Sequence, residues 1–287
     1  TMTLSGSNTY TGLTTVEEGV LQSGADEVLY NSGALQVVTG GTFDVNGFKE
    51  TVGSVALVDG TLDDTAGGGL LTALTYDLQN GQVNSALGEG AISKTTGGTV
   101  VLNAATLAAA VDVAFGTLTL DETEVLADLA AVRVDSVLDM QGGYDETIGS
   151  LSGRGLVLLN SAVLTTGGND ASTLFSGSIQ GDGDLNKVGS GQFELTGKNT
   201  LVGTTTIYNG GLLLNGSLGT DVMVAADGLL TGNGIVHGTV VNEGTLAPGN
   251  TIGTLVADEY ISAPDSVHEI EVNGSGEHDQ VLVTGGA

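Results

Sequence analysis

The sequence repeats itself at long intervals, and this feature most constrains its fold. Several separate blocks recur in the same order. The aligned pairs are residues 4–16 with 195–207 (an offset of 191, without a gap), 43–47 with 138–142, 50–54 with 146–150, and 94–102 with 187–195 (an offset of 93). Three diverged copies therefore start near residues 1, 94 and 187. Repeats of this kind cannot bury their apolar faces alone and stack on one another, so the sequence predicts a solenoid.

Within each copy the apolar residues alternate with a period of two. Thr99-Val-Val-Leu102 and Gln192-Phe-Glu-Leu195 are typical of short strands. Glycine and asparagine separate the strands, because both residues tolerate the positive φ that tight corners require. These corners are at residues 40–41, 97–98, 209–211, 215–216 and 232–234. Short strands with a corner after each one predict a coil that stacks in parallel, for which we assume the roughly 22 residues per coil of known β-helices.

Two passages have helix-like composition. Residues 104–114 and 122–134 are rich in Ala, Leu and Glu and contain few helix breakers. However, Gly116-Thr-Leu and Glu124-Val-Leu align with Gly19-Val-Leu and Glu27-Val-Leu, and the following stretch of the first copy (residues 31–38) is strand-like. The repeat therefore predicts strands in both passages, with a short local helix as the alternative.

Composition excludes several classes of function. The chain contains 34 acidic against 6 basic residues, a net charge of −28, which argues against binding nucleic acid or anionic lipid. A solvated, self-repelling surface is the first interpretation of this charge, and a cation-bridged surface is the alternative. No apolar run is long enough to span a membrane, and the chain has no cysteine. Because the first residues already lie inside a repeat, we expect a fragment of a longer exported chain without a signal peptide.

Several of these blocks carry a family resemblance. Residues 4–16 and 195–216 resemble the passenger-associated transport repeat of autotransporters. Residues 138–153, and 76–84 running into 94–102, resemble the strand repeats of the same family. Residues 244–255, followed by 278–285, resemble the segment that precedes the outer-membrane barrel. Together these blocks cover nearly the whole chain, and their combination is specific although each alone is weak.

The resemblance implies an all-β fold, a right-handed parallel β-helix of the pectin-lyase-like type. It divides the chain into a passenger stalk over residues 1–216 and a C-terminal cap over residues 217–287. In the family the last coils act as an autochaperone that folds first outside the cell. The expected partner is a C-terminal outer-membrane β-barrel translocator that is not part of this chain, and the expected location is the bacterial cell surface.

The basic residues are few enough to consider one by one as candidate catalytic groups of a polysaccharide lyase. Lys94 and Lys187 occupy equivalent repeat positions, which argues against a unique catalytic role. Arg154 lies in a Ser-Gly-Arg-Gly turn. The remaining cations, Lys49, Arg133 and Lys198, form no cluster in the sequence. We therefore expect no catalytic residue among them.

Acids, histidines and serines show no catalytic pattern either. Asp63-Asp64 and Asp182-Gly-Asp184 are the nearest candidates for a carboxylate pair or a calcium loop, but both lie in glycine-rich corners and are interpreted as solvated turns. His237, His268 and His278 lack metal-ligand spacing. Ser152 fits the Gly-x-Ser-x-Gly pattern formally, in a strand corner rather than a strand-to-helix turn. We predict no catalytic, cofactor or metal site, and a turn-forming role for Asn8 and Asn199.

Three functions remain open at this level. The first is an adhesive or aggregating surface stalk whose partners are a second copy or a host or cell-surface ligand. The second is a scaffold below an enzymatic module located elsewhere in the protein, and the third is a polysaccharide-binding or polysaccharide-cleaving β-helix. Self-association would require neutral strips, for which Thr14-Thr15 and Thr204–Thr206 are candidates, or bridging cations.

Overall fold

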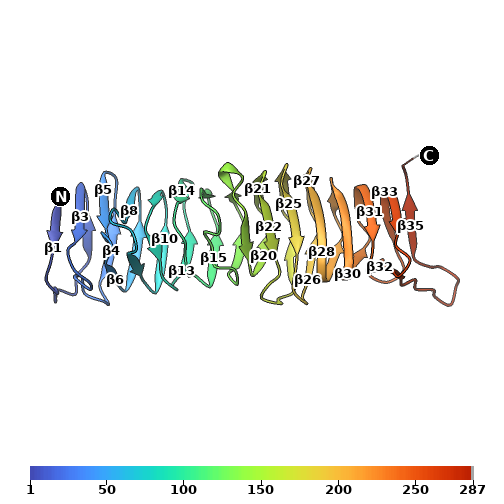
Figure 1. Ribbon diagram of the computed structural model, residues 1–287, viewed down its shortest axis with the longest axis horizontal. Coiled ribbons are helices and arrows are strands. Elements are labelled where there is room, and N and C mark those ends of the chain that lie inside the picture. The colour runs from blue at the N-terminus through green and yellow to red at the C-terminus, as the bar shows by residue number, and fades with distance from the viewer. Residues whose placement is uncertain (286–287) are drawn as a thin grey trace. The chain divides into compact units, whose positions relative to one another are not determined.

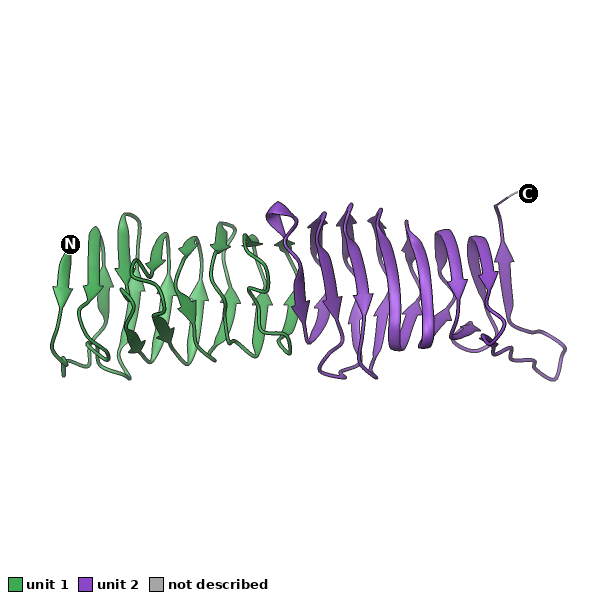
Figure 2. Cartoon of the chain, viewed as in Figure 1, with its two compact units in different colours: residues 1–139 green, residues 140–287 purple. Residues whose placement is uncertain are grey.

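The computed structural model describes residues 1–285 and contains strands, turns and a single short 3-10 helix, η1 (Gln141–Gly143). Its contacts divide the chain into two units, Thr1–Asp139 and Met140–Ala287 (Figure 2). Within each unit, short strands lie side by side in a stack (Figure 1). All strand pairs in these stacks are parallel, so each unit is a parallel β-solenoid, as the repeat predicts.

The first unit has three strand faces. One face contains, in order of pairing, β1 (Met2–Leu4), β3 (Gly19–Ser23), β5 (Gly41–Asp44), β8 (Gly60–Asp63), β11 (Gly81–Val83), β14 (Thr99–Leu102), β16 (Thr117–Leu120) and β18 (Val137–Asp139). The second contains β2 (Thr14–Val16), β4 (Ala34–Val37), β7 (Ser54–Leu57), β10 (Thr75–Leu78), β13 (Ala91–Lys94), β15 (Ala110–Val113) and β17 (Ala131–Val134). The third contains β6 (Lys49–Thr51), β9 (Leu70–Thr72) and β12 (Ala86–Leu87).

The second unit also has three faces, but its later strands run through the corners. The first face stacks β19 (Glu146–Ile148), β22 (Val163–Thr166), β25 (Asp184–Lys187) and the beginnings of β28 (Thr204–Leu214) and β30 (Asp221–Gly232). The second stacks β20 (Ser150–Gly153), β23 (Thr173–Phe175), β26 (Gln192–Leu195), the ends of β28 and β30, β32 (Thr245–Pro248) and β34 (Val267–His268). The third stacks β21 (Leu156–Asn160), β24 (Ser178–Gly181), β27 (Lys198–Leu201), β29 (Ser217–Leu218), the beginnings of β31 (Ile235–Asn242) and β33 (Thr254–Ser262), and β35 (Gln280–Val283). The ends of β31 and β33 continue the first face after β30.

The core consists of columns of inward side chains. Leu35, Val55, Tyr76, Ile92 and Val111 pair in register on successive coils, and all are at least 98% buried. Each fully buried aliphatic side chain stabilises the fold by roughly 1.5–3 kcal/mol. In this column the pairing places residues 16 to 21 positions apart on top of each other (Tyr76 with Ile92, Val55 with Tyr76), whereas other coils have the expected 22 residues, such as Gly19 with Gly41 and Leu156 with Ser178.

Some corner glycines are required by the close approach of the coils. A Cβ at Gly197 would lie 1.8 Å from the Gly177 carbonyl oxygen, and a Cβ at Gly216 would lie 2.0 Å from the Gly197 oxygen. None of the three has a positive φ. The predicted reason for corner glycines, positive φ, therefore holds at positions such as Gly40 (φ 83°) but not in this column.

The two helix-like passages contain no helix. Residues 104–114 form an isolated bridge at Thr106 and the strand β15, and residues 122–134 form turns followed by the strand β17. The prediction of strands is thus confirmed for the C-terminal part of each passage, and the rest is turn. Backbone pairing with neighbouring coils outweighs the intrinsic helical preference of Ala and Leu, because it also buries Val111 and Val132.

Candidate interaction surfaces

The equivalent lysines Lys94 and Lys187 are buried, with 0% and 1% of their surface exposed. The Lys187 ammonium donates hydrogen bonds to the carbonyl oxygens of Val188 (2.6 Å), Gly189 (2.9 Å) and Asn209 (3.2 Å), and Lys94 donates to the carbonyl of Thr96. Burial lowers the pKa of both ammonium groups, against the opposing effect of nearby Asp170 and Asp77. These lysines hold corners together from inside the coil and do not reach a substrate. Their burial had no signal in the sequence beyond their repeated position.

The other cations are at the surface and are not clustered with catalytic partners. Arg133 forms ion pairs with Asp112 (3.9 Å) and Asp135. Lys49 and Lys198 are exposed residues of β6 and β27, and Arg154 is exposed in the turn between β20 and β21.

The carboxylates singled out from the sequence accept hydrogen bonds from neighbouring groups of the chain. Asp64 accepts hydrogen bonds from the backbone N–H groups of Gly47 (2.6 Å) and Gly69 (2.7 Å), and Asp63 accepts one from Asn84 (3.3 Å). Asp184 accepts the N–H of Thr204 (2.6 Å), which joins two coils. Asp64 and Asp182 lie between strands, whereas Asp63 is the last residue of β8 and Asp184 is the first residue of β25.

The histidines and Ser152 likewise fail to form a site. His268 contacts Tyr260 through a hydrogen bond between Nε2 and the phenol and an edge-on ring contact of 5.1 Å, and His237 and His278 are exposed elsewhere. Ser152 lies inside β20, and the strand β21 follows it instead of a helix. Over residues 1–285, no group of three or more His, Asp or Glu side chains is arranged to hold a metal ion.

Asn8 lies in the loop between β1 and β2, as predicted, whereas Asn199 lies within β27. The neutral threonine strip predicted at residues 204–206 is wrong. Asn8 and Asn199 each donate through Nδ2 to the carbonyl two residues earlier and to a carbonyl of the following coil. Thr205 and Thr206, however, are buried rather than exposed, because Thr205 occupies an inward position between Leu185 and Val222. The residues 204–206 therefore offer no neutral strip for self-association. Thr15 of the first copy is exposed.

The first unit has an open groove where β6, β9 and β12 turn toward the next face. The groove measures about 600 Å³. Its floor contains Val52 and Ala73, and Leu74, which is 78% exposed, lies at its edge together with Glu89. Asn31, Ser32, Thr51 and Thr72 complete a rim of hydroxyl and amide groups. An apolar floor with a polar rim is the usual composition of a ligand-binding surface.

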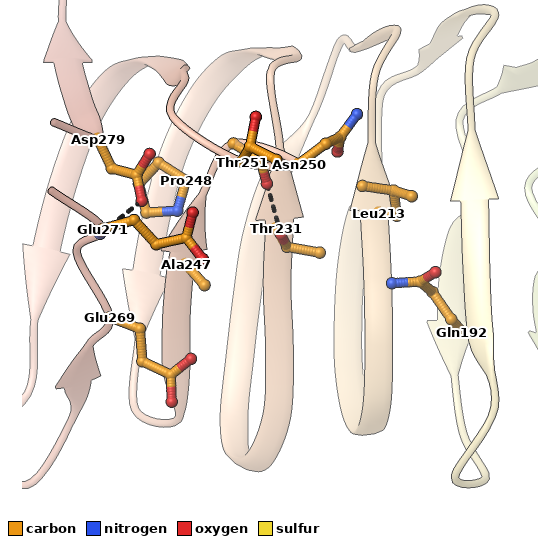
Figure 3. Close-up of a pocket in the computed structure, with 11 residues that line it drawn as sticks. Gln192, Leu213, Thr231, Ala247, Pro248, Asn250, Thr251, Glu269, Glu271 and Asp279 are labelled. Carbon is orange, nitrogen blue, oxygen red and sulfur yellow. Dashed lines mark hydrogen bonds between the residues drawn. The ribbon is translucent and has the colours of Figure 1, made fainter. Parts of the chain in front are cut away.

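The second unit has an acidic hollow near its C-terminal coils, with a volume of about 350 Å³ (Figure 3). Glu269, Glu271 and Asp279 line one side, and Gln192, Thr231 and Asn250 line the other. Asp279 is buried, and its carboxylate accepts the N–H groups of Gly253 (2.8 Å) and Glu271 (2.8 Å). It therefore fastens the last segment of the chain to the preceding coil instead of offering free ligands.

Comparison with known proteins agrees with this architecture. A family model described as the passenger-associated transport repeat matches residues 1–22 and 185–214, which belong to the first and third copies. The chain is also 31% identical over 224 residues, 68% of its length, to the adhesin BmaC autotransporter of Brucella suis biovar 1 (strain 1330). The chain is an autotransporter passenger domain. The aligned region spans about 6% of that adhesin.

No solved structure matches this passenger chain. Among its described residues, no helix is long and apolar enough to cross a membrane.

Proposed function

We propose that this passenger chain is an adhesive stalk at the bacterial surface, held there by an outer-membrane β-barrel translocator, and that it carries no enzymatic activity. The similarity to an autotransporter adhesin over 68% of the chain is the observation that carries the proposal. The contacts of the candidate catalytic residues support it, because Asp64, Asp184 and Lys187 are used to hold corners and coils together.

The groove of the first unit is the proposed adhesive surface. Leu74 offers exposed apolar area beside the buried floor residues Val52 and Ala73, and the polar rim can hydrogen-bond to a glycan or an extended peptide. Glu89 adds negative charge to a chain whose net charge is −28, so a ligand with positive or neutral groups fits better than an anionic one.

Surface display tests this function. The passenger fused to a heterologous outer-membrane translocator should make bacteria adhere to host cells or to a glycan-coated surface more than cells that display the translocator alone. Leu74→Ser should reduce adhesion at least about fivefold, since hot-spot residues contribute disproportionately to binding. Leu174→Ser, which alters an exposed leucine of the second unit, is the matched control. Adhesion that is equal with and without the passenger would reject the proposal.

We also propose that the segment from residue 217 onward caps the solenoid and seeds its folding. The longest strands, β28 with 11 residues and β30 with 12, pair with each other at the beginning of this region, and β31 and β33 continue the pairing with 8 and 9 residues. Long strands that follow a corner without interruption supply more ladder hydrogen bonds per coil than the shorter strands of the first unit, so this region is the natural place for the first stable coils.

A further inference from the structure

The groove of the first unit extends along the stack across successive corners. Ser32, Val52, Ala73 and Glu89 line it, and each lies shortly before a strand of the second face, where β4, β7, β10 and β13 pair in that order. Neighbouring coils are about 4.8 Å apart, so these corners extend over roughly 14 Å. About four or five residues of an extended peptide have the same length.

One wall of the groove is apolar and uncovered. Leu74, which is 78% exposed, occupies a corner position at which the neighbouring coils have Gly53 and Gly90. Its side chain is therefore flanked by residues without side chains, and the buried floor residues Val52 and Ala73 lie next to it. An apolar side chain of a ligand would remove this leucine from water.

The rim of the groove has unused hydrogen-bonding groups. Among residues 1–285, the side chains of Asn31, Ser32 and Thr72 have no hydrogen-bond partner. Their hydroxyl and amide groups include both donors and acceptors. They match the N–H and C=O groups that the backbone of an extended peptide presents.

The charge of the groove is negative and is not neutralised. Glu89 is exposed at its edge and forms no ion pair within the described part of the chain. On the rim, Thr51 donates its hydroxyl to Glu27 (2.9 Å), which brings a second carboxylate close to the groove. No basic residue is among those that line it. A cationic group of a ligand is therefore attracted to this groove.

We propose that the groove binds an extended peptide segment of a partner protein, with an apolar side chain next to Leu74 and a lysine or arginine next to Glu89. This inference rests on the proposed adhesive function of the groove. Side chains two positions apart on an extended chain lie on the same side, about 7 Å from each other, so the ligand has one residue between the apolar and the basic side chain. A neutral glycan fits less well, because it leaves the Glu89 carboxylate without an opposite charge, and an anionic glycan is repelled.

A peptide titration followed by NMR tests the class of ligand. The isotope-labelled chain is titrated with the blocked hexapeptide acetyl-Ser-Leu-Thr-Lys-Thr-Ser-amide, and amide signals of residues 51–53 and 72–74 should shift. Replacement of the peptide's lysine by glutamine should weaken binding about threefold, the scale of one exposed ion pair. Replacement by glutamate should weaken it at least about tenfold, because like charges repel. Neutral cellohexaose at the same concentrations should leave these signals unchanged.

Substitutions of Glu89 test the charged contact. Glu89→Gln should weaken binding of the lysine peptide about threefold and remove most of its dependence on salt between about 0.05 and 0.5 M. Glu122→Gln, which alters an exposed glutamate outside the groove, is the matched control for net charge and should have little effect. Glu89→Lys should bind the glutamate peptide more tightly than the lysine peptide, which reverses the order seen with the parent.

Three results would overturn this assignment of the ligand. They are the absence of shifts at the groove with every peptide, equal affinities for the lysine, glutamine and glutamate peptides, and binding of cellohexaose in the groove that Glu89→Gln does not change. None of them bears on adhesion by the displayed passenger, which Leu74→Ser measures separately. Peptide binding with the expected charge order, combined with adhesion that survives Leu74→Ser, would instead reject the groove as the adhesive surface.

Discussion

Tyr76 shows how one side chain can join several backbone groups at a corner. Its hydroxyl donates to the carbonyl of Leu71 (2.8 Å) and accepts the N–H groups of Ala73 (2.9 Å) and Gly88 (3.0 Å), the last of these from the next coil. Burial raises the pKa of this phenol, so it stays protonated and able to donate under ordinary conditions.

Tyr76→Phe should lower the free energy of unfolding of the first unit by about 1–3 kcal/mol, because the buried Ala73 N–H loses its partner while the ring still fills the core. The Gly88 N–H and the Leu71 carbonyl remain hydrogen-bonded to each other. Urea denaturation measures the change. Tyr208→Phe, at an exposed tyrosine, should stay within about 0.5 kcal/mol of the parent. Equal effects of the two substitutions would show that the Tyr76 hydroxyl does not stabilise the corner.

Thr205 is the opposite case, a buried hydroxyl with no hydrogen-bond partner. It lies in a core column between Leu185 and Val222. Thr205→Val keeps the branched shape and removes the unsatisfied group, so we expect the second unit to gain about 1 kcal/mol in thermal or urea unfolding. Thr204→Val, on the exposed side of the same strand, should have little effect. Destabilisation by Thr205→Val would mean that the hydroxyl has a partner such as a buried water.

Glu50 is a buried carboxylate whose ionisation is disfavoured in the folded protein. Burial raises its pKa above the ordinary value of 4.5, the N–H groups of Leu29 and Val28 oppose this rise, and the charge of Glu27 adds to it. A raised native pKa means that the contribution of Glu50 to stability is fully present below about pH 4.5 and is lost as the pH rises through its native pKa.

The stability of the parent relative to Glu50→Gln should therefore increase as the pH is lowered from 8 toward 4.5. Unfolding midpoints of both proteins across this range give the difference. Glu243→Gln, which alters an exposed glutamate, is the control for the general effect of net charge. A difference that stays constant, or falls, as the solution is acidified would contradict the assignment.

At the scale of strands and corners, glycine spacing limits how closely coils can stack. Gly177, Gly197 and Gly216 lie in one column. At each of them a Cβ would clash with a backbone carbonyl oxygen of the preceding coil. By contrast, a Cβ at Gly211 would meet its nearest neighbour, a Gln192 side-chain atom, at an ordinary 3.6 Å.

Gly197→Ala should destabilise the second unit by roughly 3 kcal/mol or more, because the methyl group forces two coils apart and stretches ladder hydrogen bonds on both sides. Gly211→Ala should be close to neutral. Differential scanning calorimetry of the two variants provides the comparison. If both variants unfolded at the same temperature as the parent, the coils would adapt to a methyl group more easily than the close backbone contacts indicate.

At the scale of the whole molecule, stability depends on neighbouring coils, so the position of a deletion matters. Removal of residues 1–93 should leave a chain that refolds cooperatively, since the remaining coils keep their neighbours. Removal of residues 217–287 should slow or abolish refolding, because it deletes β30 and with it the whole of its long pairing with β28. Stopped-flow refolding of the two truncated chains tests this difference. Equal rates would count against a C-terminal folding seed.

Much of the architecture was predictable from the sequence because local pattern and stacking agree. The period-two alternation, the corner residues and the offsets of 93 and 191 all predict a parallel solenoid, and the repeat correctly overrode helical composition at Val111 and Val132. The repeat also indicated that Asn8 and Asn199 share an environment, and both make the same two side-chain donations, although Asn199 lies within β27 rather than in a turn.

Only the tertiary structure decided which polar residues face inward. Lys94, Lys187, Glu50 and Thr205 are buried, although sequence patterns place such residues at the surface. For Glu50 and Lys187 the environment includes groups of adjacent coils: the N–H groups of Val28 and Leu29, and the carbonyl of Asn209, lie 21 or 22 positions away in the sequence. The same physical reason explains the glycines of the Gly177, Gly197 and Gly216 column. The spacing of the coils arises from stacking, and a residue's own segment does not encode it.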